Sequence, residues 1–225
     1  MNRRAHLALL SGVFVILWAL LAIAPIDRST WWLENTLLIA GAGILVGTRR
    51  TLPLSGSSYS MLFVFFCLHA IGAHYTYSLV PYDQMVSSLS GSSLNEALGL
   101  QRNHYDRLVH LAYGLLLALP LRELLMLHAG VRGFWSYFLP IDVVASSSLA
   151  YELIEWAAAL AYGGDLGIAF LGTQGDEWDA HRDMALASLG ALLTMLLVAT
   201  FNRIRGSDLT LEWFERIGRL REETR

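Results

Sequence analysis

Residues 106–128, DRLVHLAYGLLLALPLRELLMLH, join a polar beginning to a long apolar run. As a helix, this stretch is long enough to cross the ~30 Å hydrocarbon core of a bilayer, which takes about 20 residues. The sequence therefore predicts an all-α fold, a polytopic transmembrane helical bundle of about six spans. The five further apolar stretches lie at 7–25, 33–48, 59–80, 135–162 and 182–202.

The composition supports a membrane protein. Of the 225 residues, 55% are hydrophobic and only 16% are charged, and the mean hydropathy is +0.46. All the basic residues are arginine and the formal net charge is -3, which leaves no basic surface for nucleic acid. The single cysteine, Cys67, lies in an apolar run and predicts neither a disulfide nor a cysteine metal site. Residues expected at the membrane interfaces are Trp31, Trp32, Trp135 and Trp178.

The N-terminus could be interpreted as a signal peptide, because arginines precede an apolar stretch. The stretch at 7–25 is long, contains Trp18 and lacks a convincing small-x-small cleavage site, so we expect an uncleaved first span. No internal repeat or Gly/Ser linker divides the chain. The expected organisation is a six-helix transmembrane domain at 1–202 and a cytoplasmic amphipathic tail at 203–225, for which an exposed helical tail is the alternative.

The positions of the arginines predict the orientation in the membrane. Arginine occurs before the first span and after every second span, as the positive-inside rule requires of cytoplasmic segments. We therefore expect a multi-pass protein of a bacterial plasma (inner) membrane with both termini in the cytoplasm. The arginines concerned are Arg3, Arg4, Arg49, Arg50, Arg122, Arg132, Arg203 and Arg205.

With this topology, three polar stretches meet at the outer side of the membrane. Ionisable residues near lipid are costly, so each stretch is a candidate functional site. On the inner side the charges are more balanced, which predicts ordinary anchoring and pairing. The outer stretches are NHYDRLVH at 103–110, YELIE at 151–155 and QGDEWDAHRD at 174–183.

The first two stretches each place two ionisable side chains close together on a helix. Asp106 and His110 are four residues apart, which suits a pair of metal ligands or a base with its orienting carboxylate. A packing contact between helices is the structural alternative. Glu152 and Glu155 need a cation, an arginine or a shared proton, because two neighbouring carboxylates in an apolar span repel each other.

The third stretch is the most specific. Asp176, Asp179 and Asp183 recur at i, i+3 and i+7 along one stripe of a helix. Helix capping explains one or two of them, but Asp183 lies too far into the helix to be a cap. Asp179 and Asp183 repel each other unless a positive group lies beside them, and Arg182 and a metal ion are the two candidates.

The acids of the outer side outnumber its arginines, which favours a bound cation. Oxygen ligands together with imidazole suit a divalent metal ion such as Mg, Mn or Zn, although the spacing matches neither zincin nor EF-hand motifs. In this hypothesis Glu152 and His110 are the catalytic residues and handle the proton. The expected metal ligands are Asp106, His110, Glu155, Asp179 and Asp183.

Four motifs carry a resemblance to a known family: HYDRLVH at 104–110, RE at 122–123, YELIEW at 151–156 and AFLGTQGDEWDAHRDM at 169–184. In these motifs the chain resembles the YjdF-like family of bacterial inner-membrane proteins, a group without a firmly assigned activity. The resemblance covers the C-terminal half and implies a location in the inner membrane. The family usually has Gln where this chain has His181, which argues against His181 as a ligand.

A more distant resemblance is to VanZ-like membrane proteins. That family pairs an Asp-x-x-x-His-like helix start with a later helix start that contains Arg or Asp and ends in Gly. Ala187 stands where that family has Asn. The resemblance implies a role in the cell envelope and adds no established reaction. The matching residues here are Asp106, His110, Asp183 and Gly190.

Three functions fit these observations. The first is a metal-dependent membrane enzyme that acts on a lipid-linked or envelope substrate, in which the cation polarises a phosphoryl or carbonyl oxygen. The second is an ion- or proton-coupled transporter, in which the carboxylates relay protons or bind the coupling ion. The third is a structural or accessory membrane protein, whose polar network only fixes the register of the helices. All three have the lipid bilayer as their partner.

Overall fold

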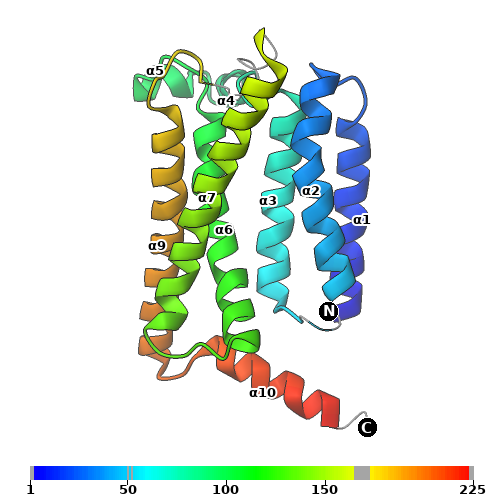
Figure 1. The fold of residues 1–225 in the computed structure, drawn as a ribbon, viewed down its shortest axis with the longest axis vertical. Helices are drawn as coiled ribbons and strands as arrows, with labels where there is room; N and C mark the ends of the chain where they lie inside the picture. Colours follow the sequence, from blue (N-terminus) through cyan, green and yellow to red (C-terminus); the bar gives the residue numbers. More distant parts are fainter. Residues whose placement is uncertain (1–2, 50, 52, 165–172, 223–225) are drawn as a thin grey trace.

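The computed structural model describes residues 3–49, 51, 53–164 and 173–222. Six long helices of the described residues run side by side as a bundle, and α10 lies across one end of it (Figure 1). The predicted all-α membrane bundle is confirmed, since these residues contain helices and no strand. The helices are α1 (Arg3–Leu21), α2 (Arg28–Thr48), α3 (Gly56–His74), α4 (Tyr82–Ser90), α5 (Leu94–Leu98), α6 (Tyr105–His128), α7 (Trp135–Tyr162), α9 (Asp179–Arg205) and α10 (Leu209–Glu222).

The six long helices coincide in place with the six predicted spans. Four of them, α3, α6, α7 and α9, are long and apolar enough to cross a membrane, and α1 contains a shorter apolar segment, Ala5–Leu21. The short helices α4 and α5 lie at one end of the bundle, here called the α4 end. The start of α1 and the whole of α10 lie at the opposite end, here called the α10 end (Figure 1).

Large apolar side chains cover the outside of the bundle. In water such a surface would mark an interaction site or a tendency to aggregate, whereas in a bilayer it faces lipid tails. The outward faces of α1 and α9 show the pattern clearly. Their exposed apolar residues include Leu9, Val13, Ile16 and Leu20 on α1, and Leu189, Leu193, Leu196 and Leu197 on α9.

Exposed tryptophans mark two levels along the bundle. Trp135 begins α7 at the α10 end and Trp156 follows 21 residues later near the α4 end, each 57% exposed. At 1.5 Å per residue their separation is about 31 Å, which matches the hydrocarbon thickness of a bilayer. Trp32 is exposed as predicted, but the prediction for Trp31 was wrong. Trp31 is 2% exposed and packs against Trp18.

The prediction for the third span, 59–80, extends past the observed end of α3. The chain turns back after His74, because Thr76 and Tyr77 adopt positive φ angles of 52° and 54°. The Tyr77 ring then lies against Gly72, where a Cβ atom would be 2.6 Å from the ring. Residues without a special backbone preference rarely adopt positive φ, so apolar composition alone gave no sign of this turn.

Helices α6 and α9 cross in direct backbone contact. A Cβ atom on Gly114 would lie 1.9 Å from the carbonyl oxygen of Ala187, and one on Gly190 would lie 2.4 Å from that of Leu111. Small residues allow such close approach between membrane helices, where van der Waals packing drives association. The crossing lies about two to three turns below the polar start of each helix and therefore fixes those starts relative to each other.

Two neighbouring charged residues of α6 have polar partners at the α10 end. Arg122 on α6 is fully buried, and its guanidinium donates to both carboxylate oxygens of Asp208, at 3.1 and 2.5 Å, and to Thr210 Oγ1 at 2.7 Å. The neighbouring Glu123 accepts a hydrogen bond of 2.8 Å from the backbone N–H of Ser55, the cap of α3. The turn between α9 and α10 is thereby anchored to the bundle. Because α9 continues to Arg205, the expected tail begins within its last turn.

Candidate functional site

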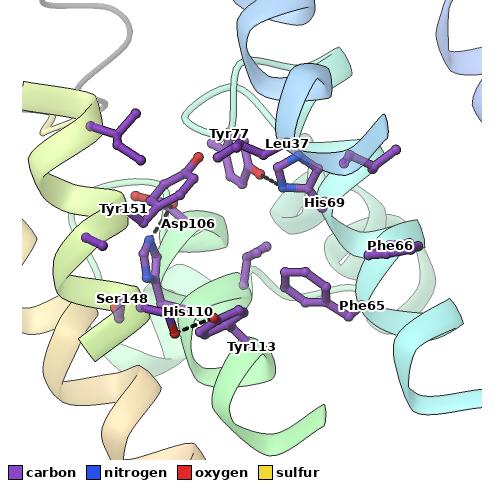
Figure 2. A pocket seen from close by; sticks show the side chains of 15 residues that line it. Leu37, Phe65, Phe66, His69, Tyr77, Asp106, His110, Tyr113, Ser148 and Tyr151 are labelled. Carbon is purple, nitrogen blue, oxygen red and sulfur yellow. Dashed lines mark hydrogen bonds and ion pairs between the residues drawn. The ribbon is translucent and has the colours of Figure 1, made fainter. Parts of the chain in front are cut away.

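A cavity of about 290 Å³ lies between α2, α3, α6 and α7. Side chains of all four helices point into it, as Figure 2 shows. Apolar and aromatic side chains make up much of its lining, among them Leu37, Phe65 and Phe66. Asp106 and His110 lie at the part nearer the α4 end. The cavity therefore joins an apolar chamber to a polar head.

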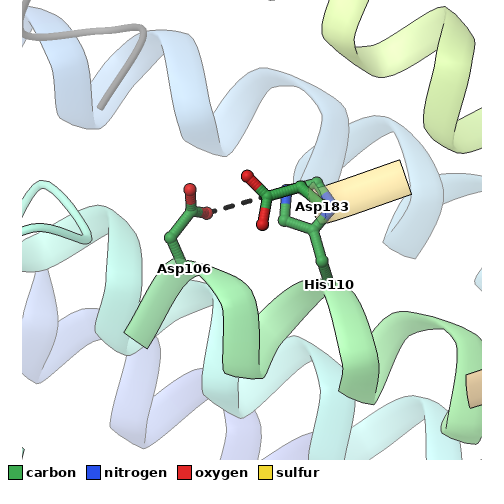
Figure 3. Close-up of side chains that lie close together, drawn as sticks. All are labelled: Asp106, His110 and Asp183. Carbon is green, nitrogen blue, oxygen red and sulfur yellow. Dashed lines mark ion pairs between the residues drawn. The ribbon is translucent and has the colours of Figure 1, made fainter. Parts of the chain in front are cut away.

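The polar head contains three side chains that converge from two helices. Asp106 and His110 occupy successive turns of α6, as their spacing predicted, and Asp183 approaches from α9 (Figure 3). One potential ligand atom of each lies within 4.8 Å of the other two, and His110 Nε2 is 3.7 Å from Asp106 Oδ1. The Asp183 side chain is 2% exposed. The direct α6–α9 contact at the glycines below sets this geometry.

The two glutamates of α7 lie beside this group. Glu152 Oε1 is 3.6 Å from His110 Nε2. Glu155 is close enough to Asp106 and Glu152 for their charges to interact, although it is not one of the three convergent ligands. Both Glu152 Oε1 and Asp183 Oδ1 are buried without a hydrogen-bond partner among the described residues. Buried carboxylate oxygens without partners are costly, so a bound proton or a cation at these two atoms would stabilise them.

Asp179, expected as a metal ligand, lies outside this group and is held by arginines. Arg102 Nη1 is 2.7 Å from Asp179 Oδ1 and Arg102 Nη2 donates to Oδ2 at 3.1 Å. Arg107 Nη2 donates to Asp179 Oδ1 at 3.2 Å. Arg182, one of the two candidates for the positive group beside Asp179, pairs with Asp176 instead. The expectation of a metal ion at Asp179 stays a prediction. Spacing along α9 could not show that residues near position 105 supply the positive charge.

Asp176 is the second aspartate that contacts arginines at the α4 end. It lies before α9 and pairs with Arg102, Arg107 and Arg182. Burial acts to raise the pKa of Asp176, but the N–H of Trp178 and the arginine charges lower it below the usual value. Arg102, Arg107 and Arg182 are thus committed to Asp176 and Asp179. None of the contacts found among the described residues brings an arginine to Asp183 or Glu152.

Carboxyl groups outnumber basic groups in and around the polar head. Two unit charges 4 Å apart interact by about 4 kcal/mol at an effective dielectric constant of 20. A cluster of carboxylates at such distances needs a cation or bound protons to be stable. His110 is the ionisable nitrogen group that the described residues place among them. The acids concerned are Asp106, Glu152, Glu155 and Asp183, with Glu34 close to Glu155.

Sequence reasoning missed Glu34 as a member of this region. Glu34 on α2 is buried, and Tyr151 on α7 donates a hydrogen bond of 3.1 Å to its Oε2. Its backbone carbonyl is 3.0 Å from His69 Nε2, and His69 Nδ1 is 2.5 Å from the Tyr77 hydroxyl. An acid within the second apolar stretch was the available signal, because ionisable residues in spans are rarely incidental.

Comparison with known proteins identifies the family. A family model described as "Predicted membrane protein (DUF2238)" matches residues 6–203. The "Inner membrane protein YjdF" of Escherichia coli (strain K12) is 41% identical over 181 residues, which cover 80% of this chain and 82% of that protein. No solved structure matches. The resemblance to VanZ-like proteins stays a prediction, because neither match bears on it.

The matched region contains the polar motifs of α6, α7 and α9, although residues 169–172 of the last motif lie outside the described residues. The predicted YjdF-like resemblance is confirmed, and it extends well beyond the C-terminal half on which it was based. The chain is an integral membrane protein and belongs to the DUF2238 family of predicted membrane proteins.

Proposed function

We propose that Asp106, His110 and Asp183 bind a divalent cation and that the protein is a metal-dependent membrane enzyme acting on a lipid-linked substrate. The observation that carries this proposal is the convergence of three ligand atoms within 4.8 Å beside two buried carboxylate oxygens without partners. A cation between them would satisfy both oxygens and offset the repulsion among the acids.

The chemistry of the ligand atoms limits which metal ions can bind. Two carboxylates and an imidazole are ligands of Mn and Zn and, with more oxygen ligands, of Mg. Three protein ligands leave further positions for water or substrate, as in catalytic rather than structural metal sites. A bound cation of this kind supplies Lewis-acid activation of a phosphoryl or carbonyl oxygen.

The neighbouring residues have separate roles in this proposal. Glu152 lies 3.6 Å from His110 and has an oxygen without a partner, so it can accept a proton from a nucleophilic water or ligate the cation. Glu155 contributes negative charge from outside the ligand group. In this proposal Asp179 is not a ligand, because Arg102 and Arg107 occupy its oxygens.

The position of the group favours an enzyme over a transporter. Coupled carriers tend to place their ion sites near the middle of the membrane, at broken helices. Glu152 lies four residues before Trp156 on an unbroken α7, about 6 Å below the level of that tryptophan. This level lies just inside the edge of the hydrocarbon region, close to the lipid head groups and far from the middle of the membrane. Exposed arginines, including Arg49, Arg132 and Arg203, lie at the α10 end, which under the positive-inside rule supports an outward-facing polar head.

The test is elemental analysis of the protein purified in detergent without chelator. We expect one equivalent of Mg, Mn or Zn in the wild type and loss of that metal in Asp183→Asn. Asp142→Asn, an exposed aspartate of α7 far from the group, is the matched control and should retain the metal. Absence of stoichiometric metal in the wild type, even after titration with each of the three ions, would refute the metal site. A positive result justifies screening lipid-linked phosphates and esters as substrates.

A further inference from the structure

The cavity below the metal-ligand group reaches the lipid-facing surface between α2 and α7. Helix α2 packs on α3, whereas α7 packs on α6 and α9, and no extensive packing joins α2 directly to α7 in the described part of the chain. Leu37 of α2 and Ile154 of α7 both line the cavity, yet they are 46% and 51% exposed. These two side chains therefore flank a lateral opening.

The opening lies within the hydrocarbon region. Ile154 is two residues before Trp156, which places it about 3 Å below the tryptophan level. On α6, Tyr113 lines the cavity seven residues after Asp106, about 10 Å further from the α4 end. The cavity thus extends from near the edge of the hydrocarbon region toward the middle of the membrane, parallel to the lipid chains.

Hydrogen-bonded pairs close the edge of the cavity nearest the α4 end. The Tyr151 hydroxyl bridges from α7 to Glu34 of α2 at 3.1 Å, and Tyr77 joins His69 at 2.5 Å. Below these pairs the lining is dominated by Leu37, Phe65 and Phe66. An apolar chamber that opens toward lipid, and whose aqueous edge is bridged, suits a hydrocarbon chain rather than a water-soluble molecule.

We propose that this cavity holds one hydrocarbon chain of a phosphate-bearing membrane lipid, which enters between α2 and α7 and brings its phosphate to Asp106, His110 and Asp183. The phosphate part rests on the proposed function, because a cation must bridge the phosphate and the carboxylates. The chain part rests on the shape, lining and depth of the cavity alone. A lipid that enters this way separates Tyr151 from Glu34 as it passes.

The experiment uses the full-length protein in vesicles of phosphatidylethanolamine and phosphatidylglycerol that contain a trace of phosphatidic acid with a photoactivatable diazirine acyl chain. After irradiation, labelled peptides are mapped by mass spectrometry. We expect labels on the cavity-facing residues Phe65 and Tyr113, and loss of those labels in Leu37→Trp and in Ile154→Trp, which obstruct the opening from opposite sides. Both substitutions are at half-exposed positions, and size-exclusion profiles verify the fold.

The matched controls are Ile39→Trp and Leu153→Trp. Ile39 is as exposed as Leu37, at 46%, and Leu153 is 52% exposed beside Ile154, but neither lines the cavity. Labels at Phe65 and Tyr113 should persist in both controls. Labels confined to outward-facing residues, or equal at Phe65 and Tyr113 in all four variants, would overturn the proposal.

One further variant separates this inference from the metal site. Asp183→Asn should lose the metal and keep the labels at Phe65 and Tyr113. A wild type that is labelled there but binds no metal would refute the metal enzyme and support the chain site. A wild type that binds metal without cavity labels would refute the chain site alone.

Discussion

Asp179 and Asp183 lie one turn apart on α9 and have opposite surroundings. Both are buried, but arginines hold the oxygens of Asp179 whereas Asp183 Oδ1 has no hydrogen-bond partner among the described residues. The two carboxylates therefore act differently on stability. One is part of a satisfied ion-pair layer, and the other adds charge to a group that already contains Asp106 and Glu152.

Because of this contrast, we expect substitutions of the two aspartates to change the stability of the cation-free protein in opposite directions. Asp179→Asn should lower the free energy of unfolding by about 1.5–3 kcal/mol, because it removes charge-assisted hydrogen bonds to Arg102 and Arg107. Asp183→Asn should raise the melting temperature, because it relieves repulsion with Asp106 and Glu152. Thermal unfolding in detergent after chelator treatment measures both. A fall in both variants would contradict the contrast.

Among single residues, the spacing of acids and histidine along a helix predicted some features of the site and not others. The i, i+4 relation of Asp106 and His110 depends only on helix geometry, and so it was available from the sequence. The distinction between Asp179 and Asp183 was not, because it depends on Arg102 and Arg107, more than seventy positions away. Local periodicity carries no information about which distant side chain neutralises which acid.

At the scale of elements, the α6–α9 crossing positions the candidate site. Gly114→Ala and Gly190→Ala must each push the helices apart, since a Cβ at either position would overlap the backbone of the other helix. We expect each to cost about 1–3 kcal/mol of stability, as overpacked cores do, and to weaken metal binding by moving Asp183 away from α6. Thermal unfolding and metal titration test this.

The control for the crossing is Gly43→Ala on α2. A Cβ atom there would meet nothing within 4 Å. The Gly43→Ala variant should therefore keep the melting temperature and the metal content of the wild type. Metal binding that survives intact in Gly114→Ala would show that the ligand geometry does not depend on the crossing.

The pair of Arg122 and Asp208, which anchors α10 to the bundle, predicts that the stability of the fold depends on pH. Burial acts to raise the pKa of Asp208, but the hydrogen bonds and charge of Arg122 lower it below the usual 3.8. A carboxyl group whose pKa is lower in the folded state stabilises the fold fully above its unfolded pKa, and loses that effect as the pH falls through the folded value. The anchor should therefore weaken only below pH 3.8.

Asp208→Asn tests this dependence. At neutral pH it should cost about 3–5 kcal/mol, because it leaves the buried Arg122 without its partner. The difference in melting temperature between the wild type and this variant should shrink as the pH falls below 3.8. A difference that stays constant down to pH 2 would mean that Asp208 does not titrate as part of the anchor.

Element boundaries were less predictable than element positions. The six apolar stretches located the six long helices, because a span is recognisable by length and composition alone. The turn at Thr76 and Tyr77 was missed, since it depends on a ring that packs on Gly72 and on a hydrogen bond to His69. The short helices α4 and α5 lie in the connection between the third and fourth predicted spans, which length and composition of the spans do not describe.

For the whole molecule, orientation is the property that the positive-inside rule predicts and that labelling can test. In a Cys67→Ala background, Ser90→Cys places a thiol at the α4 end and Arg132→Cys places one at the α10 end, both at exposed positions. A membrane-impermeant maleimide should label Ser90→Cys in intact spheroplasts, and Arg132→Cys only after lysis. The reverse pattern would place the metal-ligand group on the cytoplasmic side.

The lateral opening between α2 and α7 has a consequence for how such a protein would be supplied with substrate. A molecule that arrives through the bilayer reaches the site by diffusion in two dimensions. Its supply is then set by its mole fraction among the surrounding lipids rather than by any aqueous concentration. Turnover would accordingly saturate with surface density, fall on dilution with inert lipid or detergent, and stay unchanged when the volume of buffer is doubled.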